Sequence, residues 1–140
     1  MEKNKKWLED YSLYMAIKNS WAELLERVEA PLKTRQEAAL EEKRVELKEQ
    51  MDFICFQQYE FAKQWEKLKQ YANEKDIQII GDIPIYVAFD SADAWANPEL
   101  FQFDENSTPL AVAGCPPDAF AATGQLWGNP LYRWDYHAQT

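Results

Sequence analysis

The distribution of glycine and proline constrains this chain more than any other feature of its sequence. The first 75 residues contain no glycine, and their single proline is Pro31. All 4 glycines and the other prolines lie in the remaining residues. Both residue types are unfavourable inside helices, so their absence favours helix and their clustering favours turns and loops. The sequence therefore predicts helices over residues 1–75, and a strand with long loops over residues 76–140.

Aromatic residues near the N-terminus recur at helical spacing. Trp7, Tyr11, Tyr14 and Trp21 are separated by four, three and seven residues, which places them on one helical face. Ser20 followed by Glu23 has the spacing of a capping box, and predicts a second, short helix from Trp21 to the residue before Pro31. Thr34 and Glu37 repeat this spacing and predict another helix start.

A longer periodic pattern predicts one extended helix over residues 47–72. Its apolar positions alternate in steps of three and four, with a polar interruption at Gln58. They are Leu47, Met51, Ile54, Phe61, Trp65, Leu68 and Ala72. Phe53, Phe56 and Tyr59 lie on adjoining faces, so the pattern predicts a helix that is buried on more than one side.

The segment after this helix reads as a buried strand. Residues 76–82 form a short run rich in β-branched side chains that ends in Gly81-Asp82, and Pro84 holds Ile83 extended. A helix, a turn and a buried strand are half of a βαβ unit. One strand cannot form a sheet by itself, and a (β/α)8 barrel needs roughly 250 residues. We therefore expect the 140 residues to be part of a larger α/β fold.

Residues 88–134 combine turn signals and aromatic residues with little periodicity, which predicts long loops. The residues that follow, 133–137, read as the beginning of another helix.

Charge and composition exclude several classes of function. The net charge is −9 and no basic patch is present, which argues against nucleic acid and anionic membranes as partners. A neutral polysaccharide meets no such electrostatic objection. The N-terminus lacks an apolar signal segment, and Cys55 and Cys115 form no pair or metal spacing. We therefore expect a cytoplasmic protein with free thiols.

Common catalytic and cofactor motifs are missing from these residues. His137 is the only histidine and has no nucleophile motif near it, so a catalytic triad is not predicted. The sequence has no glycine-rich phosphate loop, and no cofactor is predicted. Asp90 and Asp93 could hold a hard cation, although no spaced set of histidines and cysteines indicates a metal.

Three places carry candidate binding residues. Asp82 follows the predicted strand, where side chains project into the mouth of an α/β barrel, although an aspartate can equally cap a turn there. Asp118 and Phe120 follow Pro116-Pro117, which would present them rigidly to a ligand or form an ordinary surface loop. These residue types suit a rim that holds an apolar ring.

The third place lies between Gly124 and Trp134. Trp127 supplies a stacking face, and Gln125 and Asn129 supply hydrogen bonds suited to hydroxyl-rich sugars. The alternative is a turn whose tryptophan is packed into the core.

Several long motifs resemble the amylomaltase and disproportionating-enzyme family of 4-alpha-glucanotransferases. They are Gly81-Asp82-Ile83-Pro84-Ile85-Tyr86-Val87, Asp90-Ser91-Ala92-Asp93-Ala94-Trp95, Pro116-Pro117-Asp118-x-Phe120 and Gly124-Gln125-Leu126-Trp127-Gly128-Asn129-Pro130-Leu131-Tyr132. Trp7-Leu8-Glu9-Asp10-Tyr11 and Gln58-Tyr59-x-Phe61-x-x-Gln64-Trp65 are similar to the same family. The resemblance covers nearly the whole chain in order.

This resemblance implies a partial (β/α)8 barrel with long helices and extended loops, acting on α-1,4-glucans and maltooligosaccharides. It implies substrate-binding roles for Asp82, Asp118, Phe120, Trp127 and Asn129. The family often has a tyrosine where this chain has Ala119, which removes a ring from that loop.

The family's nucleophile lies in an Arg-Ile-Asp-His type motif that these residues do not contain, and its acid/base glutamate is also missing. No catalytic residue is therefore predicted, and we expect the 140-residue chain to be inactive alone. Two other possibilities are a non-catalytic carbohydrate-binding or helical interaction module, and part of a related α-glucan hydrolase.

Overall fold

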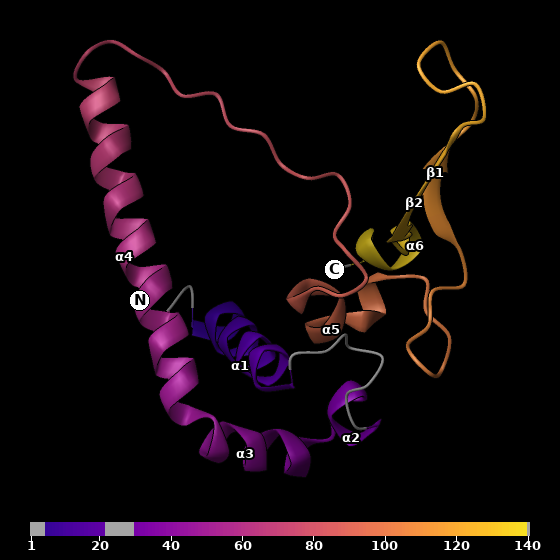
Figure 1. Ribbon diagram of the computed structural model, residues 1–140, viewed down its shortest axis with the longest axis horizontal. Helices are drawn as coiled ribbons and strands as arrows, with labels where there is room; N and C mark the ends of the chain where they lie inside the picture. The colour runs from indigo at the N-terminus through magenta and orange to yellow at the C-terminus, as the bar shows by residue number, and fades with distance from the viewer. Residues whose placement is uncertain (1–4, 22–29, 140) are drawn as a thin grey trace.

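The computed structural model describes residues 5–21 and 30–139. Within these ranges the first half is helical and the second half holds a small sheet (Figure 1). The helices of the first half are α1 (Lys5–Trp21), α2 (Ala30–Lys33), α3 (Glu37–Glu46) and α4 (Lys48–Asn73). The division predicted from the glycine and proline distribution is therefore confirmed for the helical half.

Two of the predicted helix starts are wrong. Ser20 lies inside α1, where its hydroxyl donates to the Ile17 carbonyl at 2.8 Å instead of capping a new helix. The rest of the helix predicted before Pro31 falls on residues 22–29, which lie outside the described residues, and Pro31 itself belongs to α2. Thr34 donates to the Ala30 carbonyl at 2.8 Å, closing the last turn of α2. Helix α3 begins at Glu37 with Gln36 as its N-cap, without a capping side chain.

The hydrophobic core lies where α1 meets α3, α4 and α5 (Ala92–Ala96). Its buried members are Leu13, Tyr14, Ala16, Ile17, Leu32, Leu40, Leu47, Ile54 and Trp95. Trp95 is central, because its indole nitrogen donates to the Leu32 carbonyl at 2.9 Å and its ring lies 5.6 Å from that of Tyr14. The guanidinium of Arg35 stacks over the same ring at 4.3 Å. These contacts join residues from both halves of the chain.

The long predicted helix is confirmed as α4, but its predicted burial on several sides is wrong for the described residues. Leu47, Met51 and Ile54 contact the core. Other large side chains of α4 are exposed, Phe53 by 59%, Phe61 by 66% and Leu68 by 54%. The reason is that the core cluster reaches only the first turns of α4. Periodicity identified the helix correctly but could not say what covers each face.

The predicted strand at residues 76–82 is not formed. Residues 77–91 instead make an extended segment that connects α4 with α5 (Figure 1). Ile80 is 95% exposed and Ile83 is 80% exposed. A strand requires a partner for its backbone groups, and the one sheet among the described residues uses other segments. The side-chain pattern is that of a strand, but the described residues provide no neighbouring strand with which it pairs.

The region from residue 88 to residue 134, which was predicted to form long loops, contains several helices and strands. These are α5, a 3-10 helix over Pro98–Leu100, and an antiparallel hairpin of β1 (Val112–Cys115) and β2 (Gln125–Pro130). Ser91 caps α5 by accepting from the Ala94 amide at 3.2 Å. The helix predicted from residue 133 is confirmed as α6 (Trp134–His137). The hairpin was missed because short strands interrupted by glycine and proline carry little periodicity.

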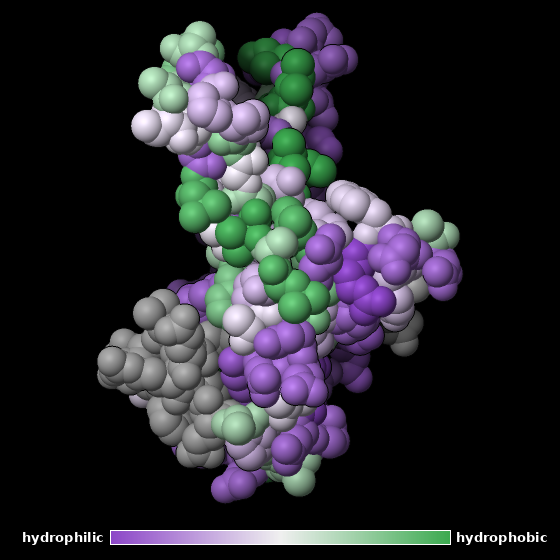
Figure 2. Space-filling model, turned by 90° about the vertical axis from the view of Figure 1, so that its right-hand side faces the viewer, coloured by the Kyte–Doolittle hydropathy of each residue, from purple (hydrophilic) through white to green (hydrophobic). Residues whose placement is uncertain are grey.

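Hydrophobic side chains also gather on the surface. Figure 2 views the molecule from the right-hand side of Figure 1, and it shows a continuous band of hydrophobic surface there. Exposed isoleucines of the extended segment add to this character, and they are Ile77, Ile79, Ile80, Ile83 and Ile85. Surfaces of this kind are uncommon on isolated soluble domains and mark places where another surface binds.

Asp90 holds the end of the extended segment against α1. Its carboxylate accepts a hydrogen bond from the Tyr14 hydroxyl at 2.5 Å and from the Lys18 ammonium at 2.5 Å. Burial of the Tyr14 phenol and its bond to the Asp90 carboxylate raise the pKa of Tyr14 well above its usual range. The protonated phenol is therefore part of the folded structure.

The first prediction concerns the close approach of the two hairpin strands. A methyl group on Gly114 would lie 2.5 Å from the backbone oxygen of Gln125, whereas one on Gly81 would meet nothing within 4 Å. Gly114→Ala should lower the free energy of unfolding by about 1–3 kcal/mol, and Gly81→Ala should change it by less than about 0.5 kcal/mol. Urea unfolding of both variants measures this, and equal stabilities would contradict the described hairpin register.

The second prediction follows from the raised pKa of Tyr14. Above pH 10.0, the usual value, the unfolded chain releases the Tyr14 proton while the folded chain keeps it. The folded state then binds more protons, so stability falls by about 1.4 kcal/mol for each further pH unit. Tyr14→Phe should remove this component of the alkaline loss, as measured by urea unfolding between pH 9 and pH 11. Tyr59→Phe, at an exposed position on α4, is the control, and an equal effect of both variants would refute the prediction.

Candidate functional site

The base of the hairpin and the end of the extended segment form the candidate binding site. Trp127 and Asn129 both lie on β2, and each contacts a residue of segment 77–91. Figure 1 places this junction beside α6 and away from the long helix α4. Two parts of the chain that are separated by about forty residues thus meet at one place.

Trp127 offers an aromatic surface. Its side chain is 49% exposed, and its indole nitrogen donates to the Gln125 side-chain oxygen at 3.0 Å. The ring lies 6.2 Å from that of Tyr86, with an angle of 53° between the planes. Because the Gln125 bond and the Tyr86 contact orient the ring, the indole is a defined platform on which a sugar ring can stack.

Asn129 fastens β2 to the extended segment. Its amide nitrogen donates to the Val87 carbonyl at 2.9 Å, and its side chain is half-buried. This bond gives Asn129 a positioning role in the structure, since it fixes Val87 and the neighbouring Tyr86 beside β2. The side-chain oxygen is an acceptor as well, which suits a hydroxyl-rich ligand.

Asp118 and Phe120 lie in the loop that joins β1 to β2. One carboxylate oxygen of Asp118 accepts from the backbone amides of Phe120 at 2.8 Å and Ala121 at 2.7 Å. Gly124 closes this loop with a φ of 73°, a conformation that favours glycine. Phe120 is 96% exposed. The loop is thus shaped by Asp118 and presents the Phe120 ring to its surroundings.

Asp82 lies on the extended segment, four residues before Tyr86. It is exposed, and its carboxylate accepts from the adjacent Ile83 amide at 2.8 Å. The structure therefore brings together Trp127 and Asn129. Asp82 is on the same segment as their partners, while Asp118 and Phe120 lie at the far end of the hairpin (Figure 1).

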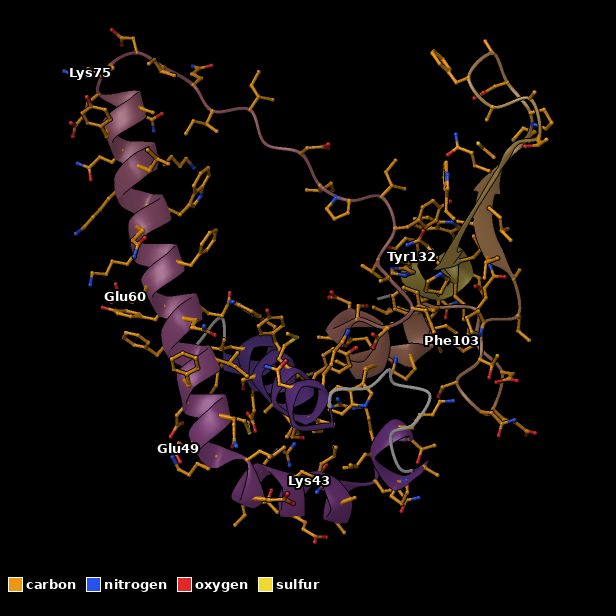
Figure 3. All side chains as sticks on the ribbon, in the orientation of Figure 1. Lys43, Glu49, Glu60, Lys75, Phe103 and Tyr132 are labelled. Atoms are coloured by element: carbon orange, nitrogen blue, oxygen red, sulfur yellow. The ribbon has the colours of Figure 1, made fainter. Side chains whose placement is uncertain are left out.

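Tyr86 and Tyr132 were not selected as site residues from the sequence. Their rings stack 6.1 Å apart with an interplanar angle of 11°, and Tyr132 also lies 5.2 Å from Trp134. Figure 3 labels Tyr132 and Phe103 on the hairpin side of the molecule, across from Glu49 and Glu60 on α4. Both tyrosines lie within motifs quoted in the sequence analysis, but nothing in their spacing indicated that the rings meet. Only the fold shows this row of aromatic side chains.

The described residues contain no group of three or more histidines, cysteines or acidic residues that could hold a metal ion. Asp90, one of the two residues considered for a cation, is in contact with Lys18 and Tyr14. In the same described ranges, no helix combines the length and the apolar character that crossing a membrane requires.

The chain is similar to known proteins over its whole length. The family model described as 4-alpha-glucanotransferase matches residues 1–140. A 4-alpha-glucanotransferase from Clostridium butyricum is 50% identical over 149 residues, covering 100% of this chain and 29% of the relative. One from Thermus thermophilus is 51% identical over 135 residues, covering 96% of this chain and 27% of the relative.

A solved structure shares the fold. The amylomaltase from Streptococcus agalactiae in complex with acarbose superposes with a TM-score of 0.92 and is 47% identical, covering 98% of this chain and 28% of that chain. The chain thus spans less than a third of the length of the relatives that it matches. Over its whole length, the chain belongs to the 4-alpha-glucanotransferase family.

Proposed function

We propose that this chain carries part of the glucan-binding cleft of a 4-alpha-glucanotransferase. The observation that supports this most directly is the Trp127 platform, oriented by Tyr86 and adjoined by Asn129. Rigid aromatic faces beside amide groups are suited to sugar rings, whose apolar faces stack and whose hydroxyls need hydrogen-bond partners. Asp82, Asp118 and Phe120 are proposed as further contacts along the same glucan.

The proposed reaction moves a segment of an α-1,4-glucan from a donor to an acceptor sugar with retention of configuration. In such a double displacement, a carboxylate attacks the anomeric carbon while an acid protonates the leaving oxygen, and these two carboxyl groups lie about 5–5.5 Å apart. The acceptor hydroxyl then displaces the enzyme carboxylate, and the acid/base group takes its proton. The nucleophile motif is missing from these residues, so the chain's own contribution is to bind and orient glucan.

The architecture proposed for the complete enzyme is a (β/α)8 barrel with inserted helices and long loops, in which residues 1–140 are part of the single catalytic domain. In this arrangement the extended segment becomes a barrel strand and Asp82 lies at its carboxyl end, which is where the active sites of such barrels are found. Exposed isoleucines on the segment support this, because barrel strands are apolar on both faces.

The proposed substrates are maltooligosaccharides and glucans derived from starch or glycogen. The related amylomaltase of known structure was solved with acarbose bound, which supports an oligosaccharide ligand. A neutral glucan also suits a chain with a net charge of −9. The proposed location is the cytoplasm, and the free thiols of Cys55 and Cys115 suit a reducing compartment.

A second candidate function is binding without catalysis, either of carbohydrate or of another helix. The exposed aromatic face of α4 favours it, with Phe56 exposed by 57%, Phe61 by 66% and Tyr71 by 62%. Glucan affinity without turnover by the 140-residue chain is the property that distinguishes this candidate from an enzyme.

The third prediction is that the purified 140-residue chain releases no glucose from maltotriose. The reason is that the family's nucleophile and acid/base motifs are missing from these residues. A coupled glucose assay measures this, with a full-length family member as the positive control. Glucose release above the buffer blank, in proportion to chain concentration, would overturn the proposal that these residues bind glucan without catalysing its transfer.

The fourth prediction concerns the stacking platform. Trp127→Ala should weaken binding of maltotriose to the chain about tenfold, because one oriented aromatic face is removed. Calorimetric titration measures the affinity. Trp65→Ala removes a tryptophan from α4, 43% exposed and remote from the hairpin, and should leave the affinity unchanged. Equal losses in the two variants would mean that the platform has no specific role.

A further inference from the structure

A cleft between α1 and α5 has no role in the site described above. It encloses about 290 Å³, close to the lower end of the range for small-molecule pockets. None of its lining residues belongs to the hairpin or to segment 77–91. Figure 1 shows α1 next to α5. The hairpin lies on the opposite side of α5.

Two aromatic rings form the α1 wall of the cleft. Trp7 and Tyr11 are one helical turn apart, and their ring centroids are separated by 6.1 Å with an angle of 57° between the planes. Trp7 is 49% exposed, so its ring borders the opening. A tilted pair of this kind leaves an indole face free for a ligand, because the two rings do not cover each other.

The α5 wall leaves room opposite these rings. Ala92 and Ala96 present only methyl groups, whereas Asp93 and Asn97, at the neighbouring positions, carry a carboxylate and an amide. An apolar surface flanked by hydrogen-bonding groups is what a pyranose ring requires, since its C–H face is apolar and its edge carries hydroxyls.

The inner end of the cleft is fixed to the core. Asp10 lines the cleft and accepts from the Arg35 guanidinium at 2.7 Å, and Arg35 stacks on the buried ring of Trp95 at 4.3 Å. This wall is therefore held by contacts with the core rather than formed on binding, which lowers the entropic cost of taking up a ligand.

The charges around the cleft favour a neutral ligand. Lys6 contributes a positive charge and Asp93 a negative one, while the carboxylate of Asp10 is paired with Arg35. An anion or a cation would meet one attractive and one repulsive group. A neutral polyhydroxylated ring, in contrast, finds both donors and acceptors there.

We propose that this cleft is a second carbohydrate-binding site, which holds one hexose ring of a glucan against Trp7, separate from the Trp127 platform. This inference rests on the proposed function for the choice of a glucan as ligand. The ring stacks on the exposed indole face, and its hydroxyls bond to the side chains of Asp93 and Asn97. Two separate contacts on one chain raise the apparent affinity for long glucans relative to short ones.

The experiment that tests this titrates the ¹⁵N-labelled 140-residue chain with maltotriose and follows the indole N–H resonances of Trp7 and Trp127. Trp7→Phe and Trp127→Phe assign these two peaks. Both peaks are expected to move in a saturable manner. Movement of the Trp127 peak alone overturns the second site and leaves the proposed function standing. If neither peak moves, both proposals fail, and movement of the Trp7 peak alone supports the cleft but not the platform.

Two variants separate binding from folding. Trp7→Ala should weaken the response of the Asn97 side-chain amide peak to maltotriose about tenfold. Trp7→Phe retains a ring and should keep most of that response. Circular dichroism melting shows whether each variant is folded. A folded Trp7→Ala chain whose Asn97 peak still responds with the original affinity would refute stacking on Trp7.

Discussion

The burial of Trp95 is the interaction on which the arrangement of this chain depends. Its indole nitrogen donates to the Leu32 carbonyl, its ring contacts that of Tyr14, and the Arg35 guanidinium stacks over it. Trp95 belongs to α5, whereas its three partners belong to the helical first half. An indole buried with its N–H satisfied contributes a large apolar area without the cost of an unpaired donor. Trp95 therefore fixes α5 against α1, together with Ala92 and Ala96 of α5, which also pack on the core.

The two candidate carbohydrate contacts lie on either side of this anchor. Asp90, bonded to Tyr14 and Lys18, and Asn129, bonded to the Val87 carbonyl, fix the end of the extended segment near α5. The Trp127 platform is thus joined to the rest of the chain by these hydrogen bonds and by ring contacts that run through Tyr86 and Tyr132 to the buried Phe101. In contrast, the α1–α5 cleft borders the core directly through Asp10 and Arg35.

The sequence predicted the helices better than the sheet, and the reason is physical. The three-and-four spacing from Leu47 to Ala72 is a local property, and α4 was identified from it. The pairing of β1 with β2 depends on backbone hydrogen bonds between separate segments. The spacing of residue types within one segment does not indicate such bonds. Trp127 and Asn129 were selected as neighbours in one motif, but their contacts with Tyr86 and Val87 could be seen only in the fold. The caps expected at Ser20 and Thr34 failed because each hydroxyl bonds backward to a carbonyl of the preceding helical turn, that of Ile17 in α1 and that of Ala30 in α2.

The extended segment, residues 77–91, exposes apolar side chains that affect the solubility of the chain. In an extended backbone Ile77, Ile79, Ile83 and Ile85 lie on one face, whereas Ile80 shares the opposite face with Gln78 and Asp82. A strand with one continuous apolar face needs another layer of side chains packed against that face. Residues 77–81 contain none of the charged residues or prolines by which exposed edges discourage pairing, and Asp82, Pro84 and Asp90 come only after them. If nothing covers the exposed isoleucines, the chain is expected to self-associate through them. Its solubility then indicates whether this apolar segment is covered.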